Sequence, residues 1–183
     1  MREKPILFNS AMVQAILEGR KTQTRRIIKQ PFEIHQHTDG LSITHPKQFN
    51  GEYCRFHPYN PPYDIGDTLW VRETFYAVPS GDPNTYVYKA DETQPDNFHY
   101  WKPSIHMPRE AARLFLKVKN VRAEQLQDIT EGGAKAEGIK LLSHVGKTIF
   151  TKDYRNAFKT LWDSIYHNWS ENPWVWVIEF EKE

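Results

Sequence analysis

The C-terminal stretch constrains the fold of this chain more than any other segment does. Residues 173–180 read Pro-Trp-Val-Trp-Val-Ile-Glu-Phe, so apolar side chains occupy neighbouring positions at its start. Successive side chains of a β-strand point to opposite faces, and this strand would therefore be apolar on both faces. Such strands lie in the middle of sheets that are covered on both sides. The sequence thus predicts a central strand here.

Four further segments are predicted to be strands. They cover residues 5–8, 68–75, 85–89 and 114–121, where β-branched, aromatic or aliphatic residues alternate with polar ones or form short apolar runs. We find no internal repeat and no low-complexity tract. The sheet is therefore expected to be assembled from separate, unrelated strands.

One face of the 68–75 strand combines apolar side chains with a carboxylate. Leu69, Val71 and Phe75 share this face with Glu73. A buried carboxylate needs a cationic or hydrogen-bonding partner, and we expect the arginines at positions 25–26 to supply it. A structural ion pair and a catalytic role are both open for Glu73.

Three helices are predicted, and all are short or of moderate length. The first covers residues 11–18, the second begins at Thr130 and ends at Gly138, and the third covers residues 153–166. Asn9 or Ser10 can cap the first. Several strands with few helices predict an α+β fold with a curled antiparallel sheet or barrel. The side chains expected to face the core are Met12, Val13, Ile16 and Leu17 in the first helix and Tyr154, Phe158, Leu161, Trp162 and Ile165 in the third.

The length of the chain predicts one domain over residues 1–183. Periodicity disappears between residues 31 and 64, a proline-rich stretch that is either an excursion over the surface or a lid. A second polar segment lies within residues 80–101. Both are interpreted as insertions into the single domain.

Composition narrows the classes of function. The net charge of +1 means that no global field attracts nucleic acid, so any attraction must come from local basic clusters. A single cysteine, Cys54, excludes an internal disulfide and fits a reducing compartment. No apolar run approaches the roughly 20 residues of a membrane span, and the N-terminus lacks a signal-peptide core. A cytoplasmic protein without membrane contact is expected, and its oligomeric state is open.

Metal and nucleotide-cofactor motifs are missing from the sequence. His35 and His37 are the one close histidine pair, and neither an HExxH motif nor the zinc-deaminase pattern occurs. There is also no P-loop and no dinucleotide glycine motif. We therefore expect no metal and no cofactor.

The segment 19–26 concentrates the candidate chemistry. It reads Gly-Arg-Lys-Thr-Gln-Thr-Arg-Arg, with four cations and two hydroxyls after a glycine that suits a helix end. The local sequence is compatible with three interpretations of this segment. It is a solvated basic turn, a binding site for an anion, or a catalytic pair in which an amine takes the proton of a hydroxyl nucleophile. In the last case Lys21 is the amine, and Thr22 or Thr24 is the nucleophile.

This segment resembles the signature of the ASCH family, a branch of the PUA-like barrels. Three further segments occur in the order that the family has them: the strand 66–73, the helix from Ile129 to Gly138, and the closing strand 176–180. The chain is more closely similar to longer bacterial and phage ASCH proteins with Trp-Val-Arg-Glu-Thr and Pro-Ser-Ile-His-Met-Pro-Arg. The resemblance implies a PUA-like β-barrel with flanking short helices, whose cleft faces nucleic acid or nucleosides.

The resemblance also implies an activity. The best-defined reaction of the family is hydrolysis of the N4-acetyl amide of N4-acetylcytidine, and its catalytic lysine, threonine and glutamate correspond by motif to Lys21, Thr24 and Glu137. The chain departs from the small amidohydrolases at Arg25, where they have an aliphatic residue. Residues expected to bind the substrate are Arg20, Thr22, Arg26, Trp70, Glu73, Ser104 and His106.

The implied hydrolysis requires a particular protonation state of Lys21 and a particular position of Lys21 relative to Thr24. Lys21 must be partly neutral to accept the proton of Thr24, and burial and neighbouring arginines would lower its pKa from about 10.4. Residues three apart in a flat strand face opposite sides, so Lys21 and Thr24 converge only through a turn or bulge after Gly19. Trp70 is interpreted as core or as a base-stacking ring. Ser104 and His106 are expected on one side of an extended segment.

A second hypothesis comes from a different class of function. In it the chain is an RNA-binding PUA-like module, possibly with ribonuclease activity, that grips phosphates through the cations of residues 20–29. Binding would then weaken steeply with salt. The partner is thus either a modified cytidine nucleoside or RNA.

Overall fold

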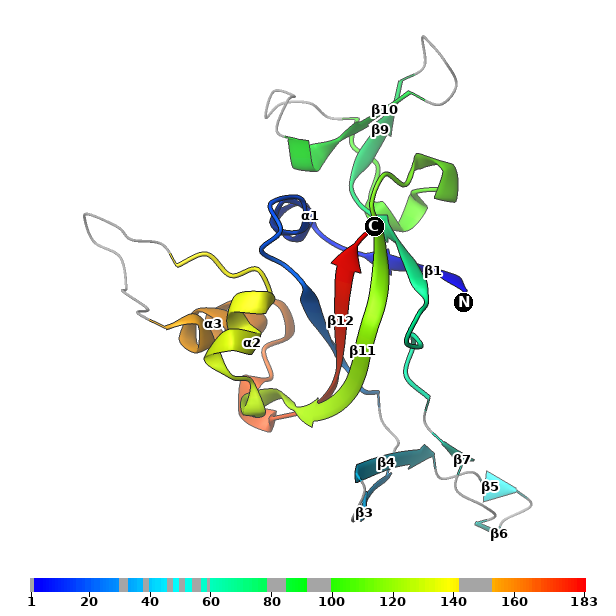
Figure 1. The fold of residues 1–183 in the computed structure, drawn as a ribbon, viewed down its shortest axis with the longest axis vertical. Coiled ribbons are helices and arrows are strands. Elements are labelled where there is room, and N and C mark those ends of the chain that lie inside the picture. Colours follow the sequence, from blue (N-terminus) through cyan, green and yellow to red (C-terminus); the bar gives the residue numbers. More distant parts are fainter. Residues whose placement is uncertain are drawn as a thin grey trace.

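A five-stranded sheet organises the computed structural model, which describes residues 2–29, 33–37, 40–45, 48–49, 52–53, 57–58, 60–78, 85–91, 100–141 and 153–183. The strand order is β1-β8-β11-β12-β2. β1 runs parallel to β8, and the other neighbours are antiparallel. Figure 1 shows the long β11 and β12 side by side through the centre of the molecule. The bounds are β1 Glu3–Leu7, β2 Gln23–Ile27, β8 Thr68–Arg72, β11 Phe115–Gln125 and β12 Trp174–Lys182.

The prediction of a central C-terminal strand is confirmed. β12 pairs with β11 on one side and with β2 on the other. Trp176 and Ile178 belong to one hydrophobic cluster, whereas Val175 and Val177 belong to a second one. Apolar residues on both faces of β12 are thus buried because each face carries its own core.

Different helices cover the two faces. α1 (Ser10–Leu17) contributes Val13 and Ile16 to the first core, together with Ile178. α3 (Tyr154–Tyr166) contributes Phe158 and Trp162 to the second core, and the short α2 (Glu131–Ala136) packs beside it. Figure 1 shows α2 and α3 together, apart from α1.

A side chain caps the start of each α-helix, at Asn9 and Thr130 as predicted and at Asp153, which was predicted only as the first residue of its helix. The Met12 amide donates to Asn9 Oδ1 at 2.9 Å, and the Gly133 amide donates to Thr130 Oγ1 at 3.0 Å. The Asn156 amide donates to Asp153 Oδ1 at 2.7 Å. The predicted core side chains are only partly right: Leu17, Leu161 and Ile165 are exposed because neither core extends over the edge of the helix that carries them.

The mixed α+β class is confirmed, but the described residues form no closed barrel. Among the described residues no backbone ladder joins the sheet edges β1 and β2. A side chain bridges them instead: Arg26 Nη2 donates to Leu7 O at 2.7 Å, and its guanidinium lies 5.5 Å from the centre of the Phe8 ring. The sheet is therefore open at this seam between β1 and β2.

Two other parts of the chain form small sheets outside the main one. Within residues 31–64, β3, β4 and β7 form one sheet and β5 pairs with β6; β9 and β10 form a separate hairpin. Both groups project from the main sheet in Figure 1. Residues 60–64, 85, 89–91 and 100–101 of the two predicted insertions are described as well, and the remainder lies outside the described residues. The bounds are β3 Glu33–His37, β4 Gly40–His45, β5 Gln48–Phe49, β6 Glu52–Tyr53, β7 His57–Pro58, β9 Phe75–Ala77 and β10 Tyr86–Tyr88, with 3-10 helices Lys89–Asp91, Ser104–His106, Arg109–Ala111, Leu126–Asp128 and Trp169–Glu171.

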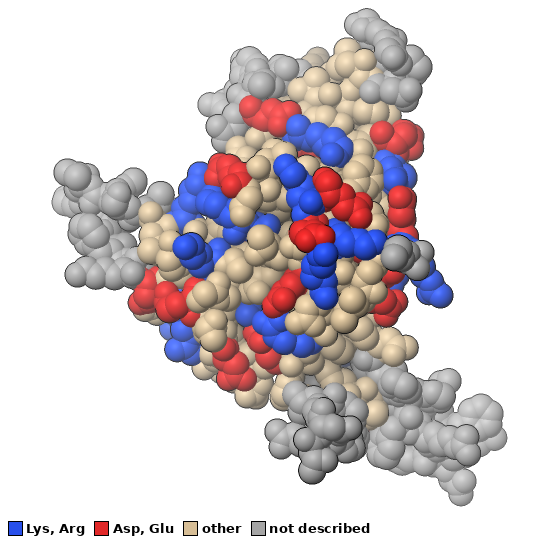
Figure 2. Space-filling model, viewed as in Figure 1, with Lys and Arg blue, Asp and Glu red and all other residues tan. Residues whose placement is uncertain are grey.

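The surface carries charges of both signs. Figure 2 shows Lys and Arg side chains interspersed with Asp and Glu over the face that it draws, without one large patch of a single sign. This distribution agrees with the net charge of +1. Within the described residues, no helix has the length and apolar character needed to span a membrane.

Candidate active site

The turn after α1 brings the basic segment against the end of α2. Gly19 has φ +72°, and the amides of Arg20 and Lys21 both donate to Ala15 O, at 2.8 and 2.9 Å. Lys21 then forms an isolated β-bridge with Glu137. Backbone pairing therefore places a residue that follows α1 beside one that ends α2.

A second glycine makes this approach possible. Gly138 has φ +87°, and a Cβ atom there would lie 2.8 Å from Ala15 Cβ and 2.9 Å from Lys21 Cβ. Real Cβ atoms essentially never come so close, so any side chain would push the end of α2 away from Lys21.

Lys21 and Glu137 form a buried ion pair. Lys21 Nζ lies 2.7 Å from Glu137 Oε2, and it also donates to Gln23 O at 2.8 Å and to Glu137 O at 3.1 Å. The two residues are 2% and 8% exposed. Burial lowers the pKa of Lys21, the charges of Arg26 and Arg25 lower it further, and Glu137 opposes this shift. The net direction is downward because removing an ammonium from water outweighs one carboxylate contact.

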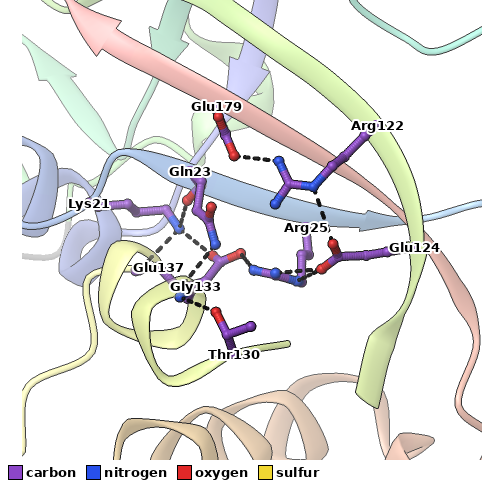
Figure 3. A network of polar contacts seen from close by, with 9 residues as sticks. All are labelled: Lys21, Gln23, Arg25, Arg122, Glu124, Thr130, Gly133, Glu137 and Glu179. Atoms are coloured by element: carbon purple, nitrogen blue, oxygen red, sulfur yellow. Dashed lines mark hydrogen bonds and ion pairs between the residues drawn. The ribbon is translucent and has the colours of Figure 1, made fainter. Parts of the chain in front are cut away.

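A chain of alternating charges continues from Glu137 (Figure 3). Arg25 Nη1 donates to Glu137 Oε1 at 3.0 Å, and Arg25 Nη2 and Nε donate to Glu124 Oε1 at 2.6 and 3.1 Å. Arg122 Nε then donates to Glu124 Oε2 at 3.3 Å, and its other end pairs with Glu179. Both carboxylate oxygens of Glu137 are thus held by cations, which fixes its orientation.

Gln23 ties β2 to α2 beside this chain. Its Nε2 donates to Gly133 O at 2.7 Å. Gln23 and Arg25 therefore point from β2 toward the same helix, as residues two apart in a strand should.

Thr24 lies on the opposite face of β2, within the first core. It is 3% exposed and sits across from Ile178. Lys21 precedes β2, and its side chain folds back onto Gln23 O, the carbonyl of the peptide that links Gln23 to Thr24. Lys21 Nζ lies 5.6 Å from the centre of the Phe8 ring that Arg26 also contacts. A turn after Gly19 is therefore present, and it directs the Lys21 amine to Gln23 O and Glu137.

The other members of the basic segment are divided between two environments. Arg20 pairs with Glu18 and donates to Gly138 O, which braces the turn. Thr22 is exposed, and its backbone bonds to Ala136 and Phe180. Arg26 is half-buried at the seam. Arg26 thus lies close enough to Lys21 for its charge to lower the pKa of Lys21.

The predicted partner of Glu73 is wrong. Its carboxylate forms a two-bond ion pair with Arg113, at 2.8 and 3.0 Å, rather than with Arg25 or Arg26. Glu73 is 1% exposed, and burial raises its pKa against the opposing effect of Arg113. The cation comes from the loop before β11, which adjoins β8, whereas β2 lies at the far edge of the sheet.

Trp70, Ser104 and His106 lie apart from the ion pair. Trp70 points away from the core face of β8, and the Arg72 guanidinium lies 5.4 Å from its ring centre. The extended segment predicted for Ser104 and His106 is wrong: they form a 3-10 turn in which the His106 amide donates to Pro103 O at 3.0 Å. Within the described part of the chain, none of the three contacts Lys21 or Glu137.

Sequence reasoning missed two parts of this region. Glu124 is 99 residues from Arg25, and no local pattern connects them. A cavity at the seam is lined by Tyr63 and Trp176, and the signal there was the cluster of prolines and aromatics before Asp64, which was interpreted only as a surface excursion or lid.

Neither a metal-binding arrangement nor a similarity to known proteins assigns a function to this region. Among the described residues, no group of three or more His, Cys, Asp or Glu side chains is arranged to hold a metal ion. No model of a known protein family, no curated protein and no solved structure matches the chain.

Proposed function

We propose that this protein is an amidohydrolase that cleaves the N4-acyl amide of N4-acetylcytidine or a related N4-acylated cytidine, on a PUA-like fold of the ASCH type. The observation that carries the proposal is the buried contact of Lys21 with Glu137, 116 residues apart in the chain, and Thr24 is buried as well. The same three residues correspond to the catalytic set of the family that the sequence resembles.

The reaction begins at Thr24. Its hydroxyl oxygen attacks the acyl carbonyl carbon, and its proton passes to the neutral amine of Lys21. The tetrahedral intermediate then expels the N4 amino group of cytidine, which takes the proton back from Lys21. Water hydrolyses the resulting ester on Thr24, which releases the carboxylate and restores the hydroxyl.

The surroundings of Lys21 suit a base. Its pKa is lowered by burial and by two arginines, which raises the fraction of neutral amine near pH 7. Glu137 orients the amine, and Arg25 keeps Glu137 in place through its second oxygen. In this proposal Glu137 and Arg25 are positioning residues, and Lys21 and Thr24 are the groups that react.

Release of cytidine from N4-acetylcytidine, measured by chromatography with a chelator present, tests the proposal. Thr24→Val keeps the shape of the side chain and removes the hydroxyl, and Lys21→Met removes the amine; each is expected to lower kcat/KM at least about a thousandfold. Thr160→Val, on the exposed face of α3, is the matched control and is expected to retain the activity. Wild-type protein should also yield an acetylated peptide that contains Thr24.

Two results would refute the hydrolase. One is absence of cytidine release by wild-type protein at micromolar concentration, and the other is equal activity of Thr24→Val and Thr160→Val. If the first were accompanied by tight, salt-sensitive binding of oligoribonucleotides, the RNA-binding module would replace the enzyme as the proposed function.

A further inference from the structure

The buried ion pair of Lys21 and Glu137 is the inner end of a longer chain of charges that reaches the surface (Figure 3). Cations and carboxylates alternate along it in the order Lys21, Glu137, Arg25, Glu124, Arg122 and Glu179. The side chains become more exposed outward, from 1% at Lys21 to 19% at Glu124 and 39% at Arg122. The charges of this chain balance, so a change at Glu124 alters the balance of charge around Lys21.

Arg25 is shared between two carboxylates, and Glu124 accepts more of its hydrogen bonds. Arg25 Nη2 and Nε donate to Glu124 Oε1 at 2.6 and 3.1 Å, whereas Nη1 alone donates to Glu137 Oε1, at 3.0 Å. The Arg25 side chain is buried, so water screens its charge little. Without the charge of Glu124, Arg25 would have Glu137 as its remaining carboxylate partner among the described residues. Its attraction for Glu137 would then increase.

Glu137 is in turn shared between Arg25 and Lys21. Its Oε1 accepts from Arg25 Nη1, and its Oε2 accepts from Lys21 Nζ at 2.7 Å. A carboxylate that lies between two cations stabilises one of them less when the other attracts it more strongly. Glu137 therefore couples the state of Arg25 to the amine of Lys21.

The other neighbours of Lys21 leave Glu137 as its counter-ion. Burial lowers the pKa of Lys21, and Glu137 raises it. Arg26 and Arg25, both from β2, lower it further. α1 contributes the Ala15 carbonyl, which accepts from the backbone amide of Lys21 and not from its amine. Among the described residues, Glu137 is the one carboxylate paired with Lys21, so the protonation of the amine depends on how fully Glu137 is available to it.

We infer that Glu124 is a positioning residue of the proposed hydrolase, which holds Arg25 so that Glu137 stays with the amine of Lys21. Its role in catalysis rests on the proposed function, whereas its coupling to Lys21 rests on the contacts of Arg25 and Glu137. Glu124 acts through these two residues, because its own hydrogen bonds come from Arg25 and Arg122.

The pH dependence of kcat/KM for N4-acetylcytidine distinguishes this role from a structural one. In Glu124→Gln, Arg25 competes more strongly for Glu137 and its charge is no longer balanced, so the midpoint of the acid limb should fall by about half a pH unit or more. A fall of about half a unit raises kcat/KM on the acid limb about threefold. In Arg25→Met, Glu137 is left to Lys21 alone, so the midpoint should rise by a similar amount. Damaged packing would lower the activity of both variants and would not shift their midpoints in opposite directions.

Titration of the Lys21 amine by NMR measures the same coupling without a substrate. The ε-carbon resonance of Lys21, identified by its loss in Lys21→Arg, should titrate at lower pH in Glu124→Gln and at higher pH in Arg25→Met than in wild type. Glu181→Gln is the matched control, because it removes the same charge from the exposed ion pair of Glu181 with Lys119. It is expected to leave both the titration and the activity unchanged.

Glu124→Gln decides the inference even where Arg25→Met fails to fold, because the Glu124 side chain is partly exposed. A shift in Glu124→Gln no larger than that in Glu181→Gln, or shifts of the same sign in Glu124→Gln and Arg25→Met, would overturn the inference. If wild-type protein released no cytidine but the NMR shifts appeared as expected, the proposed function would be refuted and the coupling of Glu124 to Lys21 would stand.

Discussion

Replacing Glu137 with glutamine measures what the buried charges contribute. The substitution keeps the shape of the side chain and removes its charge, so Lys21 stays buried next to a neutral amide. Arg25 loses one carboxylate contact but keeps Glu124 at 2.6 Å. The loss of the carboxylate charge therefore destabilises the buried ammonium of Lys21 more than the guanidinium of Arg25.

The expected loss follows from this geometry. Removing one partner of a buried ion pair costs about 3–5 kcal/mol, because the remaining charge has neither water nor a counter-ion. With a urea m-value of about 2 kcal/mol/M, the midpoint should fall by about 1.5–2.5 M. Glu181→Gln breaks the exposed pair of Glu181 with Lys119 and should cost at most about 1 kcal/mol.

The assay is urea denaturation of wild type, Glu137→Gln, Lys21→Met and the Lys21→Met/Glu137→Gln double variant. The double variant has no unpaired ammonium, so its stability should return to within about 1–2 kcal/mol of wild type. This recovery is the signature of a coupled buried pair rather than of damaged packing.

The pH dependence of the stability of Glu137→Gln tests independently whether the pKa of Lys21 is lowered in the folded protein. In Glu137→Gln, the pKa of Lys21 in the folded state falls further below its unfolded value, because the contact that opposed the shift is gone. Between those two values the unfolded chain binds more protons, so stability rises with pH. The deficit of Glu137→Gln should therefore shrink from pH 7 toward pH 10. A loss no larger than that of Glu181→Gln, or a double variant as unstable as the sum of the singles, would refute the reasoning.

Two further predictions concern the backbone and the acid stability of the fold. Gly138→Ala should lower the free energy of unfolding by about 2–4 kcal/mol in urea denaturation, because the new Cβ meets Ala15 and Lys21. In Gly19→Ala the new Cβ meets no neighbour, so this control should lose only about 1–2 kcal/mol for its positive φ. Equal losses in the two variants would contradict the packing argument. For Asp67, burial opposes ionisation, but hydrogen bonds from Lys4 and from two backbone amides hold its pKa at about 2, against 3.8. This carboxylate therefore stabilises the fold above pH 3.8 by about 1–2 kcal/mol and loses its effect as the pH falls toward 2. In thermal unfolding, the stability difference between wild type and Asp67→Asn should therefore vanish over that interval. A difference that persists at pH 2 would refute the assignment.

Local physical chemistry accounts for the parts of the fold that the sequence predicted. Asn9 and Thr130 cap helices because each offers an oxygen to an amide three residues later, whatever lies around the helix. The last strand is central because its apolar residues face both ways. In both cases the cause lies within a few residues of the effect.

The candidate site was predictable only in part. The position of Lys21 after a helix end and of Glu137 before a glycine can be read from the chain, and the family resemblance placed both in one site. The roles of Arg25 and Glu124 could not be read, because their contact joins β2 to β11 across the intervening β12. Spacing along the chain carries no information about such neighbours.

The sequence by itself determined the strands β1, β8, β10, β11 and β12, the three α-helices, the caps at Asn9 and Thr130 and the basic segment, since hydrogen-bonding capacity and side-chain alternation act over short distances. Only the tertiary structure decided that Glu73 pairs with Arg113, that Glu137 holds Lys21 and Arg25 together, and that a side chain bridges β1 and β2. Those outcomes depend on the order of the strands in the sheet. That order brings residues far apart in the chain into contact, such as Arg25 and Glu124, and no local pattern of the sequence encodes it.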